Sequence, residues 1–397
     1  MTDRQRNLND VFYALGLHMH QPPGNLKLLI EHNEWEAQQI IRCYERAARY
    51  AHMYKDVVYL HVGFSGILLE QFMDPQIIDR YRQFVDIPKM IELYRSANNI
   101  EILGMGYYHP IFPLIPREDW DQQLLLGREM IEKVFGRAPT GFWPPEMAFC
   151  MEVVPALKKA GYEYVVVDHV HVRPSVGTAR FDSFKPYIAR YGGEEISVIP
   201  RNRDLSNAQE SGLDPAWFTN EVSRKLADPP GGDKVRLVTT WSDGENGGWF
   251  RQTHEEAGFF GHFFQPLADM VRARGTGLGF TKISDFLKKY PAKDTVTVNT
   301  GAWNVGSTSG YDFAQWSGSE SQRHAIKALF DASRRYWELK VRPSSKDKGR
   351  QLEDARRLIL DAETSCYLFW GDSWIPKLYE KLKAADEKLD TIAARWL

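Results

Sequence analysis

Short apolar runs alternate with longer amphipathic segments along most of the chain up to residue 290. The runs are rich in β-prone residues, and they have the length of strands that are buried on both faces. They cover residues 11–18, 57–62, 100–103, 141–143, 164–167, 196–199, 235–241 and 278–280. Between them, apolar residues recur at helical spacing, as in residues 34–54, where Ile40, Tyr44 and Ala47 share one stripe. This alternation predicts a parallel sheet covered by helices.

Polar and aromatic motifs begin where several of these predicted strands end. The first strand runs into His18 and His20, a Gly/Tyr-rich loop that ends in His109 follows residues 100–103, and residues 141–143 lead to Glu146. Both closed barrels and open doubly wound sheets bind ligands at the carboxyl ends of their strands. The pattern therefore predicts a site at this edge and leaves the choice between the two architectures open.

The pattern changes near residue 316, where long helical stretches replace the alternation. Residues 321–339, 351–368 and 376–396 have charged outer faces and apolar residues at helical spacing. We therefore expect a barrel or sheet domain at residues 1–300 and a C-terminal helical domain at residues 301–397. Trp370 and Trp374 lie in the helical part and are expected to belong to its core.

Composition excludes several classes of function. The 397 residues carry a formal net charge of −2, so no basic field exists to attract nucleic acid or to hold a membrane surface. No stretch is long and apolar enough to span a bilayer, and residues 1–10 lack the apolar segment of a secretory signal. Cys43, Cys150 and Cys366 show no paired spacing, which fits a reducing compartment. We expect a cytoplasmic protein of undetermined oligomeric state.

Two acidic residues, 97 positions apart, lie in unusual surroundings. Glu146 follows Trp143-Pro144-Pro145, and the prolines make the backbone of this segment stiff and extended. Asp243 follows the predicted strand that ends in Trp241. A pair of carboxylates beside tryptophans favours glycosidic-bond chemistry, in which one attacks the anomeric carbon and the other protonates the leaving oxygen. Glu245 competes with Asp243 for the acid role on spacing alone.

The histidines allow a second interpretation. His18 and His20 are two apart in a predicted strand and so face the same side. They could hydrogen-bond one sugar ring or, together with Asp168, hold a metal ion. For His109, which follows a flexible aromatic loop, a functional and a structural role are equally expected.

Tryptophans near these motifs favour carbohydrate. Trp303 and Trp316 flank a Gly/Ser-rich loop at residues 301–318, a setting in which tryptophan stacks on sugars more readily than it fills a core. Together with the tryptophans beside the two acids, they make up the predicted groove lining, which is Trp143, Trp241, Trp249, Trp303 and Trp316.

Taken together, these segments resemble glycoside hydrolase family 57, whose α-glucan-active members include amylases, 4-α-glucanotransferases and branching enzymes. The resemblance covers nearly the whole chain and follows the family's five motifs in order. The segments that carry it are His18-Met19-His20-Gln21-Pro22, Glu101-Ile102-Leu103-Gly104 through His109-Pro110, Gly141-Phe142-Trp143-Pro144-Pro145-Glu146, Asp243-Gly244-Glu245-Asn246-Gly247-Gly248-Trp249, and Trp303-Asn304-Val305-Gly306 through Trp316.

The resemblance implies an α/β fold, a distorted (β/α)7 barrel with a C-terminal α-helical domain that contributes an aromatic substrate loop. It also implies a retaining mechanism without a required metal or other cofactor, with Glu146 as nucleophile and Asp243 as acid/base. His18, His20 and His109 would bind the sugar. The partner would be an α-glucan or maltooligosaccharide, with hydrolysis or transfer left open. Two alternatives are a metal-dependent polysaccharide deacetylase that uses His18, His20 and Asp168, and a catalytically silent glycan-binding protein.

Overall fold

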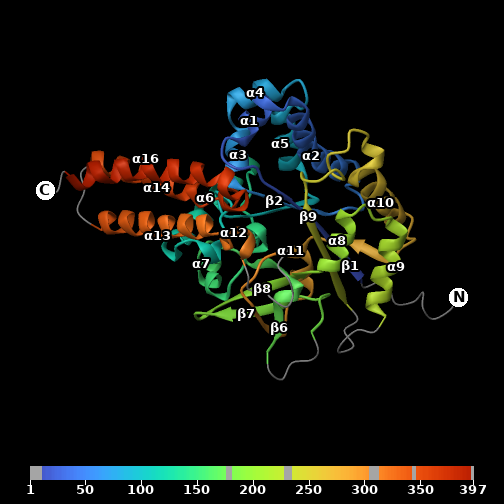
Figure 1. The fold of residues 1–397 in the computed structure, drawn as a ribbon. Coiled ribbons are helices and arrows are strands. Elements are labelled where there is room, and N and C mark those ends of the chain that lie inside the picture. The colour runs from blue at the N-terminus through green and yellow to red at the C-terminus, as the bar shows by residue number, and fades with distance from the viewer. Residues whose placement is uncertain (1–10, 176–180, 228–234, 304–312, 342–345, 395–397) are drawn as a thin grey trace.

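A ring of seven parallel strands lies at the centre of the described part of the chain, as a computed structural model shows (Figure 1). The structure describes residues 11–175, 181–227, 235–303, 313–341 and 346–394. The ring consists of β1 (Val11–Met19), β2 (Leu60–Phe64), β3 (Ile100–Leu103), β4 (Gly141–Phe142), β5 (Tyr164–Asp168), β8 (Glu194–Arg201) and β9 (Arg236–Asp243). Most of these strands are buried along nearly their whole length, as their apolar runs predict.

The ring is closed by hydrogen bonds between two groups of paired strands. Strand β1 pairs with β2 and β9, and β2 pairs with β3, while β4, β5 and β8 form the second group. Gly104 N–H donates to Gly141 O at 2.9 Å and joins β3 to β4, and Asn202 N–H donates to Thr239 O at 2.9 Å and joins β8 to β9. The predicted barrel is confirmed. Two strands share one edge of β1. Strand β10 (Leu278–Phe280) pairs with its first residues, Val11–Tyr13, and β2 pairs with its later residues, Leu15–Met19. The additional strand distorts the ring.

Helices surround the barrel, and the long ones match the amphipathic segments of the sequence. They are α1 (Asn25–His32), α2 (Glu34–Met53), α3 (Gly66–Phe72), α4 (Pro75–Tyr81), α5 (Ile87–Ser96), α6 (Arg117–Phe135), α7 (Val154–Lys159), α8 (Arg203–Glu210), α9 (Pro215–Leu226), α10 (Gln265–Arg272) and α11 (Ile283–Lys289). Three further strands, β6 (Val172–Pro174), β7 (Tyr187–Tyr191) and β11 (Thr295–Val298), extend the sheet beside β8. None of the described helices is long and apolar enough to cross a membrane.

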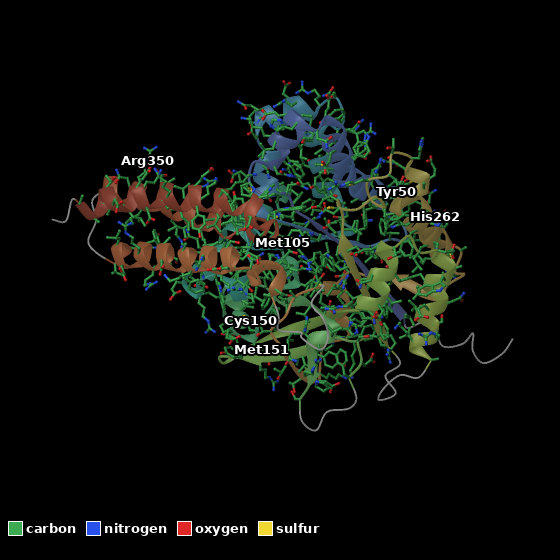
Figure 2. All side chains as sticks on the ribbon, in the orientation of Figure 1. Tyr50, Met105, Cys150, Met151, His262 and Arg350 are labelled. Carbon is green, nitrogen blue, oxygen red and sulfur yellow. The ribbon has the colours of Figure 1, made fainter. Side chains whose placement is uncertain are left out.

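Aromatic side chains fill the inside of the barrel. Trp143 and Trp241 stack with ring centroids 4.8 Å apart and an interplanar angle of 18°. Gly16 on β1 faces this stack, and a Cβ added there would lie 2.1 Å from the Trp241 ring. Met105, near the centre of the molecule in Figure 2, is fully buried in the same cluster. The barrel interior is therefore a packed core, and only its rim is free for a site.

The C-terminal part of the described chain is helical and projects to one side (left in Figure 1). It contains α12 (Ala314–Ser317), α13 (Glu320–Lys340), α14 (Lys346–Ala362), α15 (Ser365–Phe369) and α16 (Ile375–Ala394). The stripe predicted on α16, which includes Leu378, Leu382 and Leu389, is buried among these helices. Trp370 is 55% exposed, so its prediction as a core residue is wrong. The domain boundary at residue 300 stays a prediction.

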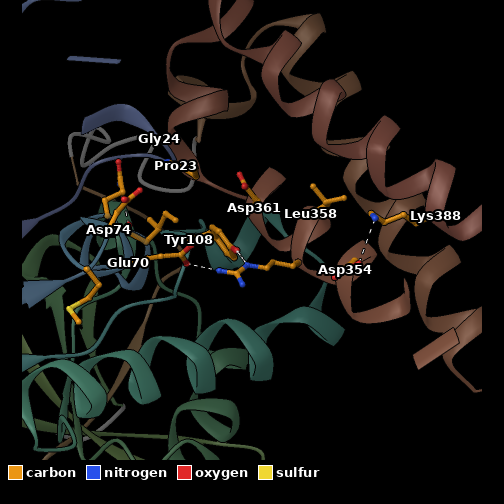
Figure 3. Close-up of a pocket in the computed structure, with 13 residues that line it drawn as sticks. Pro23, Gly24, Glu70, Asp74, Tyr108, Asp354, Leu358, Asp361 and Lys388 are labelled. Carbon is orange, nitrogen blue, oxygen red and sulfur yellow. Dashed lines mark hydrogen bonds and ion pairs between the residues drawn. The ribbon is translucent and has the colours of Figure 1, made fainter. Parts of the chain in front are cut away.

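Charged side chains join the helical part to the barrel. Figure 3 shows a cavity of 720 Å³ between α3 and α14, where Arg357 donates to Glu70 at 2.7 Å and to the Tyr108 hydroxyl at 3.2 Å. Deeper in the interface, the guanidinium of Arg356 on α14 contacts Asp119 on α6 at 2.7 Å, and neither side chain is exposed. These contacts fix α14 on the barrel, and with it the start of α15.

Candidate active site

Glu146 stands on a strained piece of backbone just beyond β4. Its φ is 56°, and that of Met147 is 51°, a left-handed conformation that residues with a side chain rarely adopt. The preceding prolines fix the approach, and Trp303 N–H donates to Glu146 O at 2.9 Å from the other side. Backbone strain of this kind costs about 1–3 kcal/mol and clusters at functional positions. The strain agrees with the functional interpretation of Glu146.

The Glu146 carboxylate accepts hydrogen bonds from two donors in distant parts of the chain. The indole N–H of Trp303 donates to Oε2 at 2.8 Å, and the Ser365 hydroxyl donates to Oε1 at 2.9 Å. Burial raises the pKa of Glu146 to about 7; the two hydrogen bonds oppose this, and the charge of Asp243 adds to it. Glu146 is therefore poised to change its charge near neutral pH.

His18, His20 and His109 form one compact group beside Glu146. His18 Nε2 and His109 Nε2 are 2.7 Å apart, and the His20 ring stacks on that of His109 at 3.9 Å with an angle of 5°. Burial lowers the pKa of all three imidazoles, and those of His20 and His109 most. We therefore treat the rings as neutral at neutral pH. The structure brings the three predicted histidines together.

A chain of hydrogen bonds fixes the tautomers of two of these rings. When Glu146 is charged, Ser365 gives its single proton to Glu146, and the 2.9 Å contact between the Ser365 oxygen and His109 Nδ1 then requires a proton on Nδ1. His109 Nε2 is then an acceptor, and His18 Nε2 donates to it. His18 Nδ1 is left as a bare acceptor, which is buried and has no partner in the described structure. A buried acceptor of this kind normally has a hydrogen-bond partner, which a bound ligand or a water molecule can supply.

The fourth motif places its two acids differently. Asp243 pairs in register with His18 across β9 and β1, and it accepts hydrogen bonds from the backbone N–H groups of Glu245 and Asn246 at 3.2 Å each. Glu245 is fully buried and accepts from His20 N–H at 2.7 Å. Burial, followed by the charge of Asp243, raises the pKa of Glu245 well above its usual range. Of the two acids, Glu245 is thus the enclosed one, and Asp243 keeps some exposed surface.

Asp243 opens onto a cavity of 340 Å³ at the barrel rim. The residues that line it are Arg201, Glu210, Asp243, Asn246, Gly247, Gly248, Trp249, Phe250 and Trp303. Because Trp303 also donates to Glu146, this one indole connects the cavity wall with the second carboxylate. The structure therefore places both predicted acids beside Trp303, although Glu146 is not among the residues that line the cavity.

The predicted tryptophan lining is only partly found. Trp249 and Trp303 line the cavity. Trp143, Trp241 and Trp316 have no exposed surface, so a sugar cannot stack on them as they lie here. The first two form the core beneath the histidines, and Trp316 packs in the helical domain against Phe369. Residues 304–312 of the fifth motif lie outside the described residues.

The metal ligands proposed from sequence are not brought together as predicted. Asp168 is fully buried and is held by Arg203 at 2.8 Å and Arg201 at 3.5 Å. His20 Nδ1 contacts the Ser65 hydroxyl at 2.8 Å. Among the described residues, a different group of His18, Asp243 and Glu245 has ligand atoms within 4.8 Å of one another.

Ser365 is the main site residue that the sequence did not indicate. It lies at the start of α15 in a helical segment without a recognisable motif, and only the docking of this helix brings it to Glu146. Arg201 and Glu210 were missed as well. Arg201 ends β8, so the rule that polar residues at strand ends form the site would have found it.

Comparison with known proteins gives one family. Residues 14–299 match the family Glycosyl hydrolase family 57. The chain is 28% identical over 319 residues to an α-amylase of Pyrococcus horikoshii, which covers 77% of this chain and 43% of that protein. It is 26% identical over 310 residues to a 4-α-glucanotransferase of Thermococcus litoralis, with 77% and 42% covered. The chain thus spans less than half the length of these curated relatives.

Solved structures of other proteins show the same fold. A family 57-type branching enzyme of Pyrococcus horikoshii superposes with a TM-score of 0.72 at 18% identity, covering 96% of this chain and 88% of that one. The 4-α-glucanotransferase of Thermococcus litoralis gives 0.68 at 21% identity, covering 98% and 60%. From the match over residues 14–299 and the shared barrel, we conclude that the chain belongs to glycosyl hydrolase family 57.

Proposed function

We propose that this protein acts on α-glucans by a retaining, double-displacement mechanism. The observation that supports the proposal is that Glu146, a strained and buried carboxylate with a donor on each oxygen, accepts a hydrogen bond from Trp303, which lines the same cavity as Asp243. Membership of family 57 and relatives named α-amylase and 4-α-glucanotransferase supply the class of substrate.

Glu146 is the nucleophile in this proposal, and Asp243 is the acid/base. A carboxylate oxygen of Glu146 attacks the anomeric carbon while the bond to the leaving oxygen breaks, and Asp243 gives that oxygen a proton. A water or a sugar hydroxyl then returns a proton to Asp243 and attacks the glycosyl-enzyme, which releases Glu146 as a carboxylate. The Trp303 and Ser365 donors stabilise the charged form of Glu146 before attack and after release.

The histidine group and Glu245 bind the sugar at the reacting position. His18 Nδ1 and Glu245 Oε2 are buried polar atoms without a partner in the described structure, and each would otherwise bear an uncompensated desolvation cost. Sugar hydroxyls, which both donate and accept, can satisfy both atoms. These hydrogen bonds can form only when the sugar is correctly oriented, and this orientation places the anomeric carbon for attack by Glu146.

The decisive test is turnover and product analysis with maltooligosaccharides and amylose. The wild type should shorten, disproportionate or branch these chains, and Glu146→Gln and Asp243→Asn should each lower kcat by at least about a thousandfold while the protein stays folded by circular dichroism. Retained turnover in Glu146→Gln would reject its role as nucleophile. Tight glucan binding without wild-type turnover would instead identify a catalytically silent binding protein.

A metal-dependent hydrolase is the second candidate, and one observation favours it. His18, Asp243 and Glu245 present ligand atoms within 4.8 Å of one another, and His18 Nδ1 has a free lone pair. Imidazole and carboxylate ligands suit Zn²⁺. Elemental analysis of the purified protein and turnover after dialysis against EDTA separate the two candidates. Stoichiometric zinc with loss of activity on chelation would favour the metal enzyme.

A further inference from the structure

Glu210 is a further carboxylate at the barrel rim, and the proposed function gives it no role. It is the last residue of α8, a helix that packs on β9, and β9 is the strand that ends in Asp243. Glu210 lines the 340 Å³ cavity together with Asp243. Its side chain is 37% exposed, so a ligand in the cavity can reach the carboxylate oxygens.

A buried cation beside Glu210 keeps this carboxylate at the cavity wall. Arg201 Nη2 lies 3.9 Å from Glu210 Oε1, and the Arg201 side chain is only 2% exposed. Its guanidinium also donates to Trp241 O at 2.7 Å, Asn207 Oδ1 at 3.2 Å and Asp168 Oδ2 at 3.5 Å. These bonds hold Arg201 in one position, and an ion pair that is partly buried is less screened by solvent than an exposed one. Glu210 therefore faces the cavity from a fixed place.

The cavity borders the leaving-group side of the reacting bond. In the proposed function, Glu146 and the histidine group hold the sugar that is attacked, and Asp243 protonates the oxygen that leaves. Asp243 is among the described residues that line the cavity, whereas Glu146 and the three histidines are not. The cavity therefore adjoins the leaving oxygen and lies outside the residues that hold the attacked sugar. Its volume is near the lower end of the roughly 300–1,000 Å³ of small-molecule sites, which suits a ligand of the size of a sugar.

We propose that Glu210 binds hydroxyl groups of the sugar on the leaving side of the bond, and of the acceptor sugar that replaces it in transfer. This inference rests on the proposed function, because both sugars meet the reacting centre at Asp243. A carboxylate has two oxygens, so Glu210 can accept hydrogen bonds from two neighbouring hydroxyls of one pyranose ring. A single water molecule gains much less from this contact. Glu210 thus favours a sugar over water as the acceptor of the glycosyl-enzyme.

The test is the partition between transfer and hydrolysis in Glu210→Gln. Maltoheptaose is the donor and ¹³C-labelled maltose the acceptor; labelled longer products measure transfer, and new reducing ends measure hydrolysis. Both products arise from the same glycosyl-enzyme, so their ratio does not depend on how fast this intermediate forms. Loss of the charged acceptor should lower the ratio about tenfold at maltose concentrations well below saturation. The ratio should approach that of the wild type as maltose is raised, because the substitution weakens acceptor binding and not the chemical step.

Asp204→Asn is the matched control on the same helix. Asp204 lies in the first turn of α8, pairs with Lys225 at 3.2 Å and is 69% exposed, so this variant should keep the wild-type ratio.

The possible outcomes separate this inference from the proposed function. Transfer and hydrolysis that fall together in Glu210→Gln, with an unchanged ratio at every maltose concentration, would mean that Glu210 only holds Arg201 and Asp243 in place, and would overturn the inference alone. So would a wild type that hydrolyses maltoheptaose but forms no labelled product at any maltose concentration. A wild type with no action on any α-glucan would overturn the proposed function, and this inference with it.

Discussion

At the scale of single residues, the environment of Glu146 combines two opposing effects. Burial makes its charged form costly, while the Trp303 indole and the Ser365 hydroxyl each favour that form. The outcome is a pKa of about 7, high for a glutamate. A nucleophile with such a pKa is fully charged only above neutral pH. Small changes in its hydrogen-bond donors therefore change the charged fraction of Glu146.

The pH dependence of catalysis should report this pKa. Because Glu146 must be ionised to attack, kcat/KM should rise with pH through about 7. The Trp303 hydrogen bond lowers the pKa of Glu146, so Trp303→Phe, which removes the N–H, should raise it and move the acidic limb to higher pH. The measurement is the pH profile of kcat/KM on maltoheptaose for both proteins.

Trp249→Phe provides the control for this shift, since Trp249 lines the same cavity and no hydrogen bond joins it to Glu146 in the described structure. Its acidic limb should stay with that of the wild type. An equal shift in both variants would mean that the aromatic wall, and not the hydrogen bond, sets the pKa. A shift to lower pH in Trp303→Phe would contradict the assignment of the limb to Glu146.

Local sequence was informative for residues that carry a motif and uninformative for residues that reach the site by tertiary packing. The stiff prolines before Glu146 and the strand before Asp243 mark both acids in the sequence. Ser365 reaches Glu146 only because α15 docks there. Trp316 sits beside glycines and serines, which suggested a loop, yet it is a core residue of the helical domain. The same residue type at Trp370 is exposed, so tryptophan alone does not separate core from platform.

At the scale of elements, strands with a continuous apolar run were predictable, and elements that depend on a partner were not. Strand β1 is buried on both faces, and its sequence shows this directly. Strands β7 and β11 are short and partly exposed, and they exist because they pair with each other beside β8. Helix α8 is mostly polar and is fixed by its Asn202 cap and its packing on β9, neither of which an apolar stripe reveals.

The docking of α14 on α6 depends on one buried ion pair, and this can be tested. Arg356 and Asp119 are both fully buried and 2.7 Å apart, and the Trp337 indole N–H also donates to Asp119 at 2.9 Å. Arg356→Met leaves the Asp119 charge buried without its cation, so it should lower the free energy of unfolding by about 3–5 kcal/mol. Urea denaturation followed by circular dichroism measures this.

Arg335→Met is the matched control on the neighbouring helix α13. Arg335 pairs with Asp386 and Asp390 on α16, but these groups are partly exposed to water. Its loss should cost no more than about 1 kcal/mol, because solvent screens the pair. Equal losses in the two variants would contradict the view that burial, and not charge pairing as such, makes the Arg356 contact important.

At the scale of the whole molecule, the candidate site is assembled from distant parts of the chain. The barrel supplies Glu146, Asp243 and the histidines, and the helical part supplies Ser365. Figure 1 shows the two parts in contact along one side of the barrel. A substrate bound in such a site touches both, and its binding should stabilise them together.

Hydrogen exchange in the presence of ligand can show whether both parts respond. In Glu146→Gln, saturating maltoheptaose should slow amide exchange in residues 141–149 and 243–249 of the barrel, and in residues 364–370 of the helical part as well. Binding suppresses local opening of the segments that it contacts, by an amount that grows with ligand concentration over Kd. Helix α4, on the outside of the barrel, should keep its exchange rate and serves as the internal reference. Protection restricted to the two barrel segments would mean that the helical domain holds Glu146 in place through Ser365 but does not bind the glucan.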